Sequence, residues 1–111
     1  MNEIARRQPP VTAIVCGSDY LAAGALAALD QAGIEVPRRL SIASFNDNDF
    51  APFLHPPLTT VRLPIREIGE RSGKHLLAQL QGTQDLPAGA ADALPVALVR
   101  RGSTGTAPGS T

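Results

Sequence analysis

The stretch Leu58-Thr59-Thr60-Val61-Arg62-Leu63-Pro64 decides how this chain folds. Apart from Arg62, its first six residues are β-branched or apolar, which predicts a strand over 58–63. Proline is favoured at the start of a helix, because its missing N–H would be unpaired there in any case. Apolar residues at helical spacing follow to about residue 81, so the chain changes directly from strand to helix at Pro64.

Working outward from this stretch, we predict three further strands. Short apolar runs at 11–16 and 40–45 read as strands, and so does 94–101 near the C-terminus. A helix over 18–32 separates the first two, and 46–57 is a loop with at most one helical turn. Alternating strands and helices predict an α/β fold with a mostly parallel sheet flanked by helices.

Apolar periodicity predicts which side of each helix is buried. The nearly continuous apolar run at 11–16 suits a strand that is covered on both faces. The first helix should bury a stripe made of Leu21, Ala25, Ala28, Leu29 and Ala32. The helix after Pro64 should bury Ile65, Ile68, Ser72, Leu76 and Leu80, with i,i+4 ion pairs on its exposed side.

Composition narrows the function classes. The chain has 111 residues, 43% of them hydrophobic, with ten basic and ten acidic side chains. This describes one globular domain or part of one, and the balanced charge argues against a broad nucleic-acid-binding face. A single cysteine excludes an intramolecular disulfide. No export-type apolar segment or stretch of about 20 apolar residues is present, so we expect a soluble, cytoplasmic protein.

Polar residues follow the ends of three predicted strands. In open α/β sheets the ligand lies beyond the carboxyl ends of the strands. This rule nominates six ligand-binding candidates: Ser18, Asp19, Asn46, Asp47, Arg62 and Leu63. Each polar candidate also has a purely structural interpretation. Ser18 and Asp19 could cap a helix, Asn46 and Asp47 could form a turn, and Arg62 could pair within the fold.

Catalytic signatures are missing from the sequence. It has no Gly-x-Ser-x-Gly elbow, no dinucleotide-binding glycine motif, no P-loop and no His-Glu-x-x-His motif. The segment Asn46-Asp47-Asn48-Asp49 lacks the turn glycine and the late glutamate of a calcium loop. We therefore predict no enzymatic activity, no cofactor and no metal.

Several segments, in order, resemble one family. They are Cys16-Gly17-Ser18-Asp19-Tyr20-Leu21-Ala22-Ala23-Gly24-Ala25, Phe45-Asn46-Asp47, Pro56-Pro57-Leu58-Thr59-Thr60-Val61-Arg62 and Leu98-Val99-Arg100-Arg101-Gly102-Ser103-Thr104. Together they are similar to the effector-binding domain of LacI/GalR-type bacterial transcriptional regulators, over about residues 1–104. The resemblance implies a periplasmic-binding-protein-like fold and a cytoplasmic regulator.

The resemblance also implies missing parts and partners. The family's helix-turn-helix and N-terminal subdomain would precede Met1, so residues 1–102 would be part of a C-terminal subdomain and 103–111 a disordered tail. A small-molecule effector, which in this family is usually a sugar, would bind in a cleft that the missing subdomain completes. Dimerisation would involve Ala23, Phe53 and Leu54, and DNA would bind only through the helix-turn-helix.

This sequence departs from the family pattern at three candidate positions. Ser18 stands where many members have asparagine, Asn46 where many have aspartate, and Leu63 where some have a polar contact. These changes leave the effector open. The alternative functions are a sugar solute-binding protein of a transporter, which shares the fold but needs an export signal, and a nucleotide-binding or enzymatic domain, which needs a glycine loop.

Overall fold

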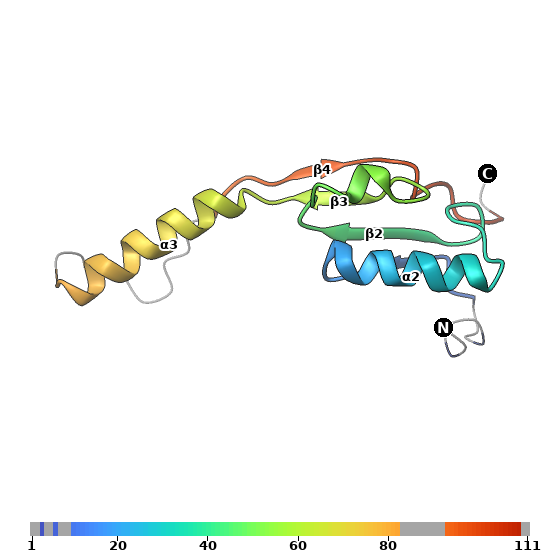
Figure 1. Cartoon of the computed structure of the whole chain (residues 1–111), viewed down its shortest axis with the longest axis horizontal. Helices are drawn as coiled ribbons and strands as arrows, with labels where there is room; N and C mark the ends of the chain where they lie inside the picture. Colours follow the sequence, from blue (N-terminus) through green and yellow to red (C-terminus); the bar gives the residue numbers. More distant parts are fainter. Residues whose placement is uncertain (1–2, 4–5, 7–9, 83–92, 110–111) are drawn as a thin grey trace. The chain divides into compact units, whose positions relative to one another are not determined.

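The computed structural model describes residues 3, 6, 10–82 and 93–109 (Figure 1). The chain forms two compact units, the first made of Met1–Arg62 with Ala97–Thr111 and the second of Leu63–Val96. The first contains a sheet and a helix, and the second contains one long helix. The predicted loop over 83–93 and the helix end expected over 1–8 lie almost entirely outside the described residues.

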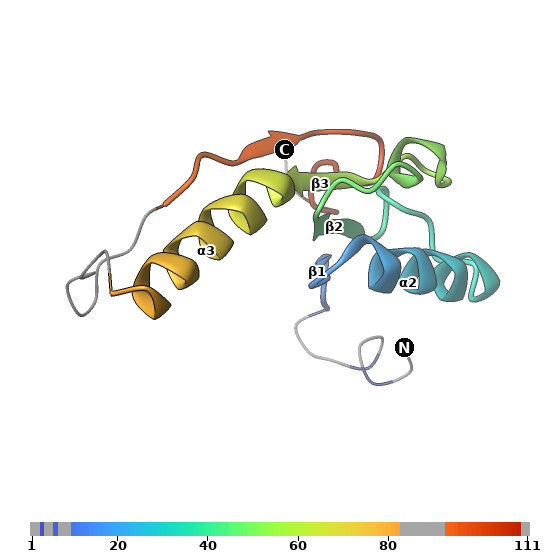
Figure 2. The ribbon, with the colours of Figure 1, turned by 60° about the vertical axis from the view of Figure 1, so that its left-hand side comes forward.

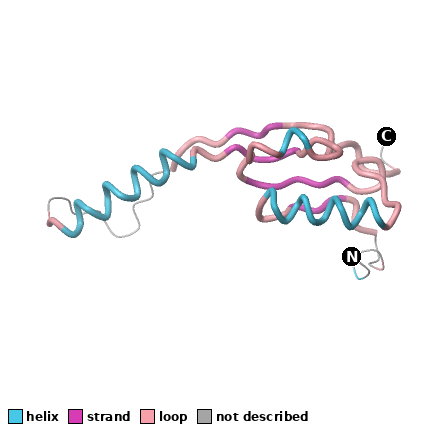
Figure 3. Tube along the Cα trace, in the orientation of Figure 1, coloured by secondary structure: helices cyan, strands magenta, loops and turns pink. Residues whose placement is uncertain are grey.

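A four-stranded sheet forms the centre of the first unit, and its strands run side by side in Figure 3. The sheet order follows the chain order: β1 (Ala13–Val15), β2 (Ser41–Phe45), β3 (Thr59–Arg62) and β4 (Ala97–Val99). The pairs β1–β2 and β2–β3 are parallel, and β3–β4 is antiparallel. The predicted α/β class and mostly parallel sheet are therefore confirmed.

Helix α2 (Asp19–Gln31) packs along β2 and covers one face of the sheet (Figure 2). Its buried side is Ala22, Leu26 and Leu29, spaced at i, i+4 and i+7. These side chains form the core with Leu40, Ile42, Ala51 and Leu58. The predicted stripe was right for Leu29 and wrong for Leu21 and Ala32, which are exposed, because the buried face of the helix is centred one position later.

The opposite face of the sheet carries exposed apolar side chains. Val15, Phe45 and Leu98 are all exposed, while Ile14 packs against the core. Successive residues of a strand point to opposite faces, so only alternate side chains reach α2. The prediction that the first strand is covered on both faces is wrong for the described part of the chain.

A segment after β4 completes the sheet unit. The Ser103 side chain is fully buried, accepts a hydrogen bond of 2.8 Å from the N–H of Thr59 and donates one of 2.6 Å to the carbonyl of Ile42. Gly105 donates through its N–H to the Ser41 hydroxyl at 3.1 Å. The disordered tail predicted from residue 103 is therefore wrong for 103–105, because these small polar residues satisfy buried backbone groups.

The second unit contains α3 (Ile65–Leu80). Pro64 precedes its first residue, and its carbonyl accepts a hydrogen bond of 2.9 Å from the N–H of Ile68. The expected ion pairs Arg66–Glu70 and Glu67–Arg71 form at 3.1 and 3.0 Å. The predicted buried side is wrong: Ile65, Ile68, Leu76 and Leu80 are between 39% and 75% exposed, because no described segment packs over the whole stripe.

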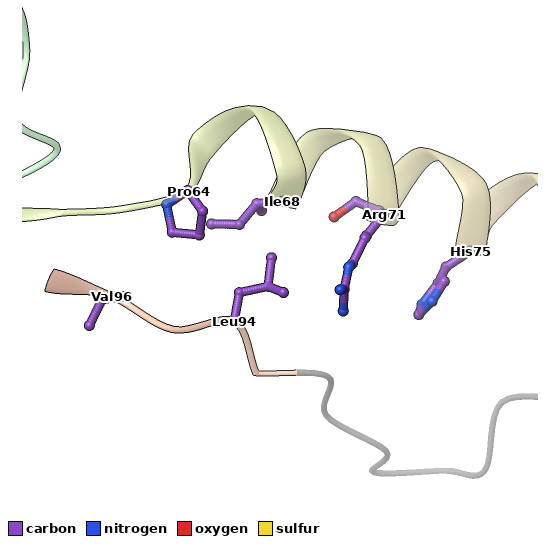
Figure 4. Close-up of a pocket in the computed structure, with 7 residues that line it drawn as sticks. Pro64, Ile68, Arg71, His75, Leu94 and Val96 are labelled. Carbon is purple, nitrogen blue, oxygen red and sulfur yellow. The ribbon is translucent and has the colours of Figure 1, made fainter.

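Within this unit, one shallow pocket lies between α3 and the segment before β4 (Figure 4). Its volume is about 360 Å³, and Leu94 points toward the helix from the opposite side. The walls combine apolar residues with the polar side chains of Arg71, Ser72 and His75. Leu94 thus lies opposite the part of α3 between Ile68 and His75.

Candidate functional site

Three chain reversals meet at one edge of the sheet. In the parallel ladders Val15 lies opposite Ala43, and Phe45 lies opposite Val61. The N–H of Asn46 donates to the carbonyl of Val61 at 2.9 Å, which continues the ladder by one bond. The carboxyl ends of β1, β2 and β3 are therefore adjacent, as expected for parallel strands.

We use the name rim for the predicted candidates at this edge of the first unit: Ser18, Asp19, Asn46, Asp47 and Arg62. The sixth candidate, Leu63, is the first residue of the second unit, so its ligand role stays a prediction.

Asp19 is the centre of a buried hydrogen-bond network at the rim. Its side chain is fully buried and has no cationic partner among the described residues. One carboxylate oxygen accepts from the hydroxyls of Ser44 and Thr60, the latter at 2.8 Å. The other accepts from the backbone N–H of Asn48 at 2.6 Å and from its side-chain amide at 3.1 Å. We call these four residues the Asp19 network.

The network keeps Asp19 ionised. Burial alone raises the pKa of a carboxyl, because it disfavours the charged form. The hydrogen bonds from Ser44, Asn48 and Thr60 outweigh this effect, so the pKa of Asp19 is below its usual value. Both oxygens are occupied by protein donors, so the carboxylate fixes the positions of α2, β2, β3 and the loop after β2.

Asp47 has a different environment, because two arginines share its carboxylate. Arg62 Nε lies 2.7 Å from one oxygen, and Arg101 Nη2 lies 2.7 Å from the other. Arg101 also donates through Nη1 to the carbonyl of Leu58 at 2.9 Å. Burial raises the pKa of Asp47, but the bonds and charges of Arg101 and Arg62 outweigh it, and the pKa is lowered.

Backbone strain coincides with this carboxylate. Asn46 has φ of 108° and Asp47 has φ of 51°, a region that residues other than glycine seldom adopt. Such strain persists only where surrounding contacts over-determine the backbone, and it is common at functional sites. Here the contacts are the ion pairs of Asp47 and a hydrogen bond of 3.3 Å from its N–H to the Thr60 hydroxyl.

Unlike the two aspartates, Ser18 and Asn46 keep side-chain hydrogen-bonding groups that a ligand could use. Ser18 is the N-cap of α2, and its hydroxyl accepts a hydrogen bond of 3.3 Å from the N–H of Leu21. Within the described part of the chain, the side-chain amide of Asn46 makes no hydrogen bond. An amide can donate and accept, which suits a ligand hydroxyl. At the rim, the side-chain amide of Asn46 is therefore available to a ligand, and the Ser18 hydroxyl can still donate its hydrogen.

Sequence reasoning missed the residues that complete these contacts: Ser44, Asn48, Thr60 and Arg101. One usable signal was present. Ser44 and Thr60 place hydroxyls in two strands of the predicted sheet, and a buried hydroxyl needs a partner. Arg101 carried no such signal, since it follows β4 and reaches Asp47 from 54 residues away.

The predicted dimer residues lie on the same unit. Phe53 ends the short 3-10 helix η1 (Ala51–Phe53), and its side chain is 85% exposed. Leu54 is partly buried and packs against the core, and Ala23 is partly buried on α2. The structure thus leaves Phe53 free to contact a partner, whereas Leu54 mainly supports the fold.

Comparison with known proteins decides the family. The model of the periplasmic binding protein-like domain matches residues 1–104. The chain belongs to this family. Among curated members, MalR of Streptomyces coelicolor and CytR of Escherichia coli, both HTH-type transcriptional proteins, are each 43% identical to this chain. The matches cover 88% and 91% of this chain but only 28% and 29% of those regulators.

Solved structures of this family agree with the fold. A putative LacI regulator from Bacillus cereus subsp. cytotoxis matches with a TM-score of 0.82 and 30% identity, over 94% of this chain and 36% of that one. The lac repressor dimer bound to operator and the anti-inducer ONPF matches with a TM-score of 0.69 and 33% identity, over 84% and 32%. The predicted resemblance to LacI-type regulators is confirmed.

No described helix has the length and apolar character needed to cross a membrane. Nor do three or more histidine, cysteine, aspartate or glutamate side chains gather as a possible metal site within that part of the chain.

Proposed function

We propose that this chain is the part of a LacI-type transcriptional regulator that senses a small-molecule effector and contributes to its dimer. The observation that carries the proposal is the convergence of three strand ends at the rim, where two buried carboxylates fix a strained backbone at Asn46. A relative from Lactobacillus casei was solved with bound sucrose, which makes a sugar the first effector class to test.

The rim residues take two roles in this proposal. Ser18, Asn46 and Arg62 contact the effector, because each keeps a polar group that the protein does not fully use. Asp19 and Asp47 position them, since protein donors surround both carboxylates. Leu63 would add an apolar contact. The chain spans less than a third of its curated relatives, so we expect weak binding by the chain alone.

The regulator would act in the cytoplasm, and it would bind DNA through a helix-turn-helix domain outside this chain. Effector binding would favour one arrangement of the regulator over another, and that population shift would change the spacing of its DNA-binding domains. No catalytic step is part of the proposal. A sugar solute-binding protein is the second candidate, because it shares the fold, but the HTH-type relatives favour the regulator.

Two measurements test the proposal. Titration of ¹⁵N-labelled chain with glucose and sucrose should shift the amide resonances of the rim at millimolar concentration, and Asn46→Ala should abolish the shifts while the exposed Asp30→Ala leaves them unchanged. Tight binding by the chain alone, or shifts confined to other surfaces, would contradict it. The coding sequence upstream of Met1 separates the two candidates: a helix-turn-helix supports the regulator, and an apolar export segment supports the transporter.

A further inference from the structure

At the rim, positive charge exceeds negative charge around Asp47. One carboxylate is shared by two guanidinium groups, so Arg62 and Arg101 together bring one more charge than Asp47 neutralises. The arginines differ in exposure: the Arg101 side chain is 15% exposed and that of Arg62 is 60% exposed. The excess positive charge is therefore accessible at Arg62.

The two arginines also differ in the donors that remain. Arg101 uses Nη2 for Asp47 and Nη1 for the carbonyl of Leu58. Arg62 uses only Nε, so both of its terminal nitrogens are uncommitted within the described residues. Asp47 thus fixes the inner edge of the Arg62 guanidinium and leaves the outer edge open. Such an edge matches two oxygens of a phosphate or carboxylate.

Position connects Arg62 to the rest of the rim. Phe45 lies opposite Val61 in the β2–β3 ladder, so the next residues, Asn46 and Arg62, are neighbours across the two strands. The free amide of Asn46 suits a hydroxyl, and the free edge of Arg62 suits an anion. Among the described residues, neither of the other nearby acids pairs with Arg62: Asp19 is enclosed by its four hydrogen bonds, and Asp49 is exposed on the loop after β2.

We infer that the effector is an anionic polyol, whose phosphate or carboxylate binds Arg62 while a hydroxyl binds Asn46. This inference rests on the proposed function and narrows it from sugars in general to sugars that carry a negative charge. Asp47 acts as the positioning residue, because its bond to Nε orients the guanidinium.

The test compares three probes on the same ¹⁵N-labelled chain: glucose, glucose 6-phosphate and inorganic phosphate. Glucose 6-phosphate should shift the Arg62 Nε–H and Asn46 amide resonances at the lowest concentration. Arg62→Gln should raise its dissociation constant about tenfold or more, and Arg62→Lys less, because lysine keeps the charge but not the two-point geometry. The exposed Arg100→Gln is the matched control and should change it less than about twofold. Asp49→Asn should not weaken binding.

Each other outcome overturns the inference in an identifiable way. If glucose binds as well as glucose 6-phosphate and Arg62→Gln affects neither, the inference fails and the proposed function stands. If inorganic phosphate binds as well as glucose 6-phosphate, the result shows an adventitious ion only. If no probe shifts the rim resonances, the proposed function fails as well. Apo spectra of Arg62→Gln that match the wild type away from residues 46–48 and 61–63 exclude a folding defect, because Arg101 still pairs with Asp47 in this variant.

Discussion

The hydroxyl of Thr60 donates a hydrogen bond of 2.8 Å to Oδ1 of Asp19, although 41 residues separate them in the sequence. This bond links the first turn of α2 to β3, and the Ser44 hydroxyl adds β2 at the same oxygen. An acidic residue in the first turn of a helix is already favoured by the helix dipole. Here it also joins the two parallel strands whose ends form the rim.

Replacement of Asp19 should destabilise the fold strongly. Asp19→Ala leaves the hydroxyls of Ser44 and Thr60 and the N–H of Asn48 without their acceptor in a buried site, which should lower the free energy of unfolding by about 3 kcal/mol. Urea unfolding measures the change. Thr60→Val removes one hydroxyl at nearly constant volume and should cost about 1 kcal/mol.

Asp30→Ala, on the exposed side of the same helix, is the control and should change stability by less than about 0.5 kcal/mol. Equal effects of Asp19→Ala and Asp30→Ala would show that the Asp19 network contributes nothing.

Acid should weaken the fold through the same carboxylates. The pKa values of Asp19 and Asp47 are lowered in the folded chain, so near pH 4 the unfolded chain binds more protons than the folded one. The stabilisation is complete above the unfolded-state pKa of about 3.9, and it decreases as the pH falls through the folded-state values. Thermal melts between pH 6 and pH 2.5 should show this loss, and Asp19→Asn should show a smaller one. A pH profile that is identical in the variant would contradict the assignment.

The sequence predicts the succession of strands and helices along the chain, and the position of the rim, because both depend on local signals. Apolar runs and Pro64 each mark an element, and parallel strands bring their carboxyl ends together. The partners of Asp19 and Asp47 depend on which side chains meet across strands, which periodicity does not encode. Apolar spacing also does not fix which side of a helix is covered: on α2 the buried face is centred one position after Leu21, and on α3 no described segment covers the whole apolar stripe.

The two arginines that bind Asp47 should contribute unequally to stability. Arg101→Ala removes a mostly buried guanidinium and leaves the Leu58 carbonyl without a donor, so we expect a loss of about 2 kcal/mol. Arg62→Gln removes a partner that is 60% exposed and screened by water, so the loss should be under about 1 kcal/mol. Guanidinium chloride screens charges, so urea is the suitable denaturant. A larger loss for Arg62→Gln would reverse our ranking of the two pairs.

Ser103 should matter to stability although it lies in a segment of small polar residues. Ser103→Ala leaves the buried N–H of Thr59 and carbonyl of Ile42 without their side-chain partner, which should cost about 2 kcal/mol. Thr106→Ala, three residues later and exposed, should have no measurable effect. If both variants have the same urea midpoint of unfolding as the wild type, the buried hydrogen bonds of Ser103 do not contribute to stability.

Phe53 should control self-association if the proposed dimer face is correct. Its ring is 85% exposed beside the partly buried Leu54, and complete burial of such a side chain contributes about 1.5–3 kcal/mol. A twofold dimer would bury both copies, so Phe53→Asp should raise the dimer dissociation constant at least about tenfold in sedimentation velocity experiments. Leu98 is an exposed apolar residue on the open face of the sheet. Leu98→Asp therefore distinguishes a dimer that forms through this face from one that forms through Phe53. If Leu98→Asp dissociates the dimer and Phe53→Asp does not, the open sheet face is the interface. If the chain stays monomeric at high concentration, it forms a dimer neither through Phe53 nor through the open sheet face, and the predicted dimer face is wrong.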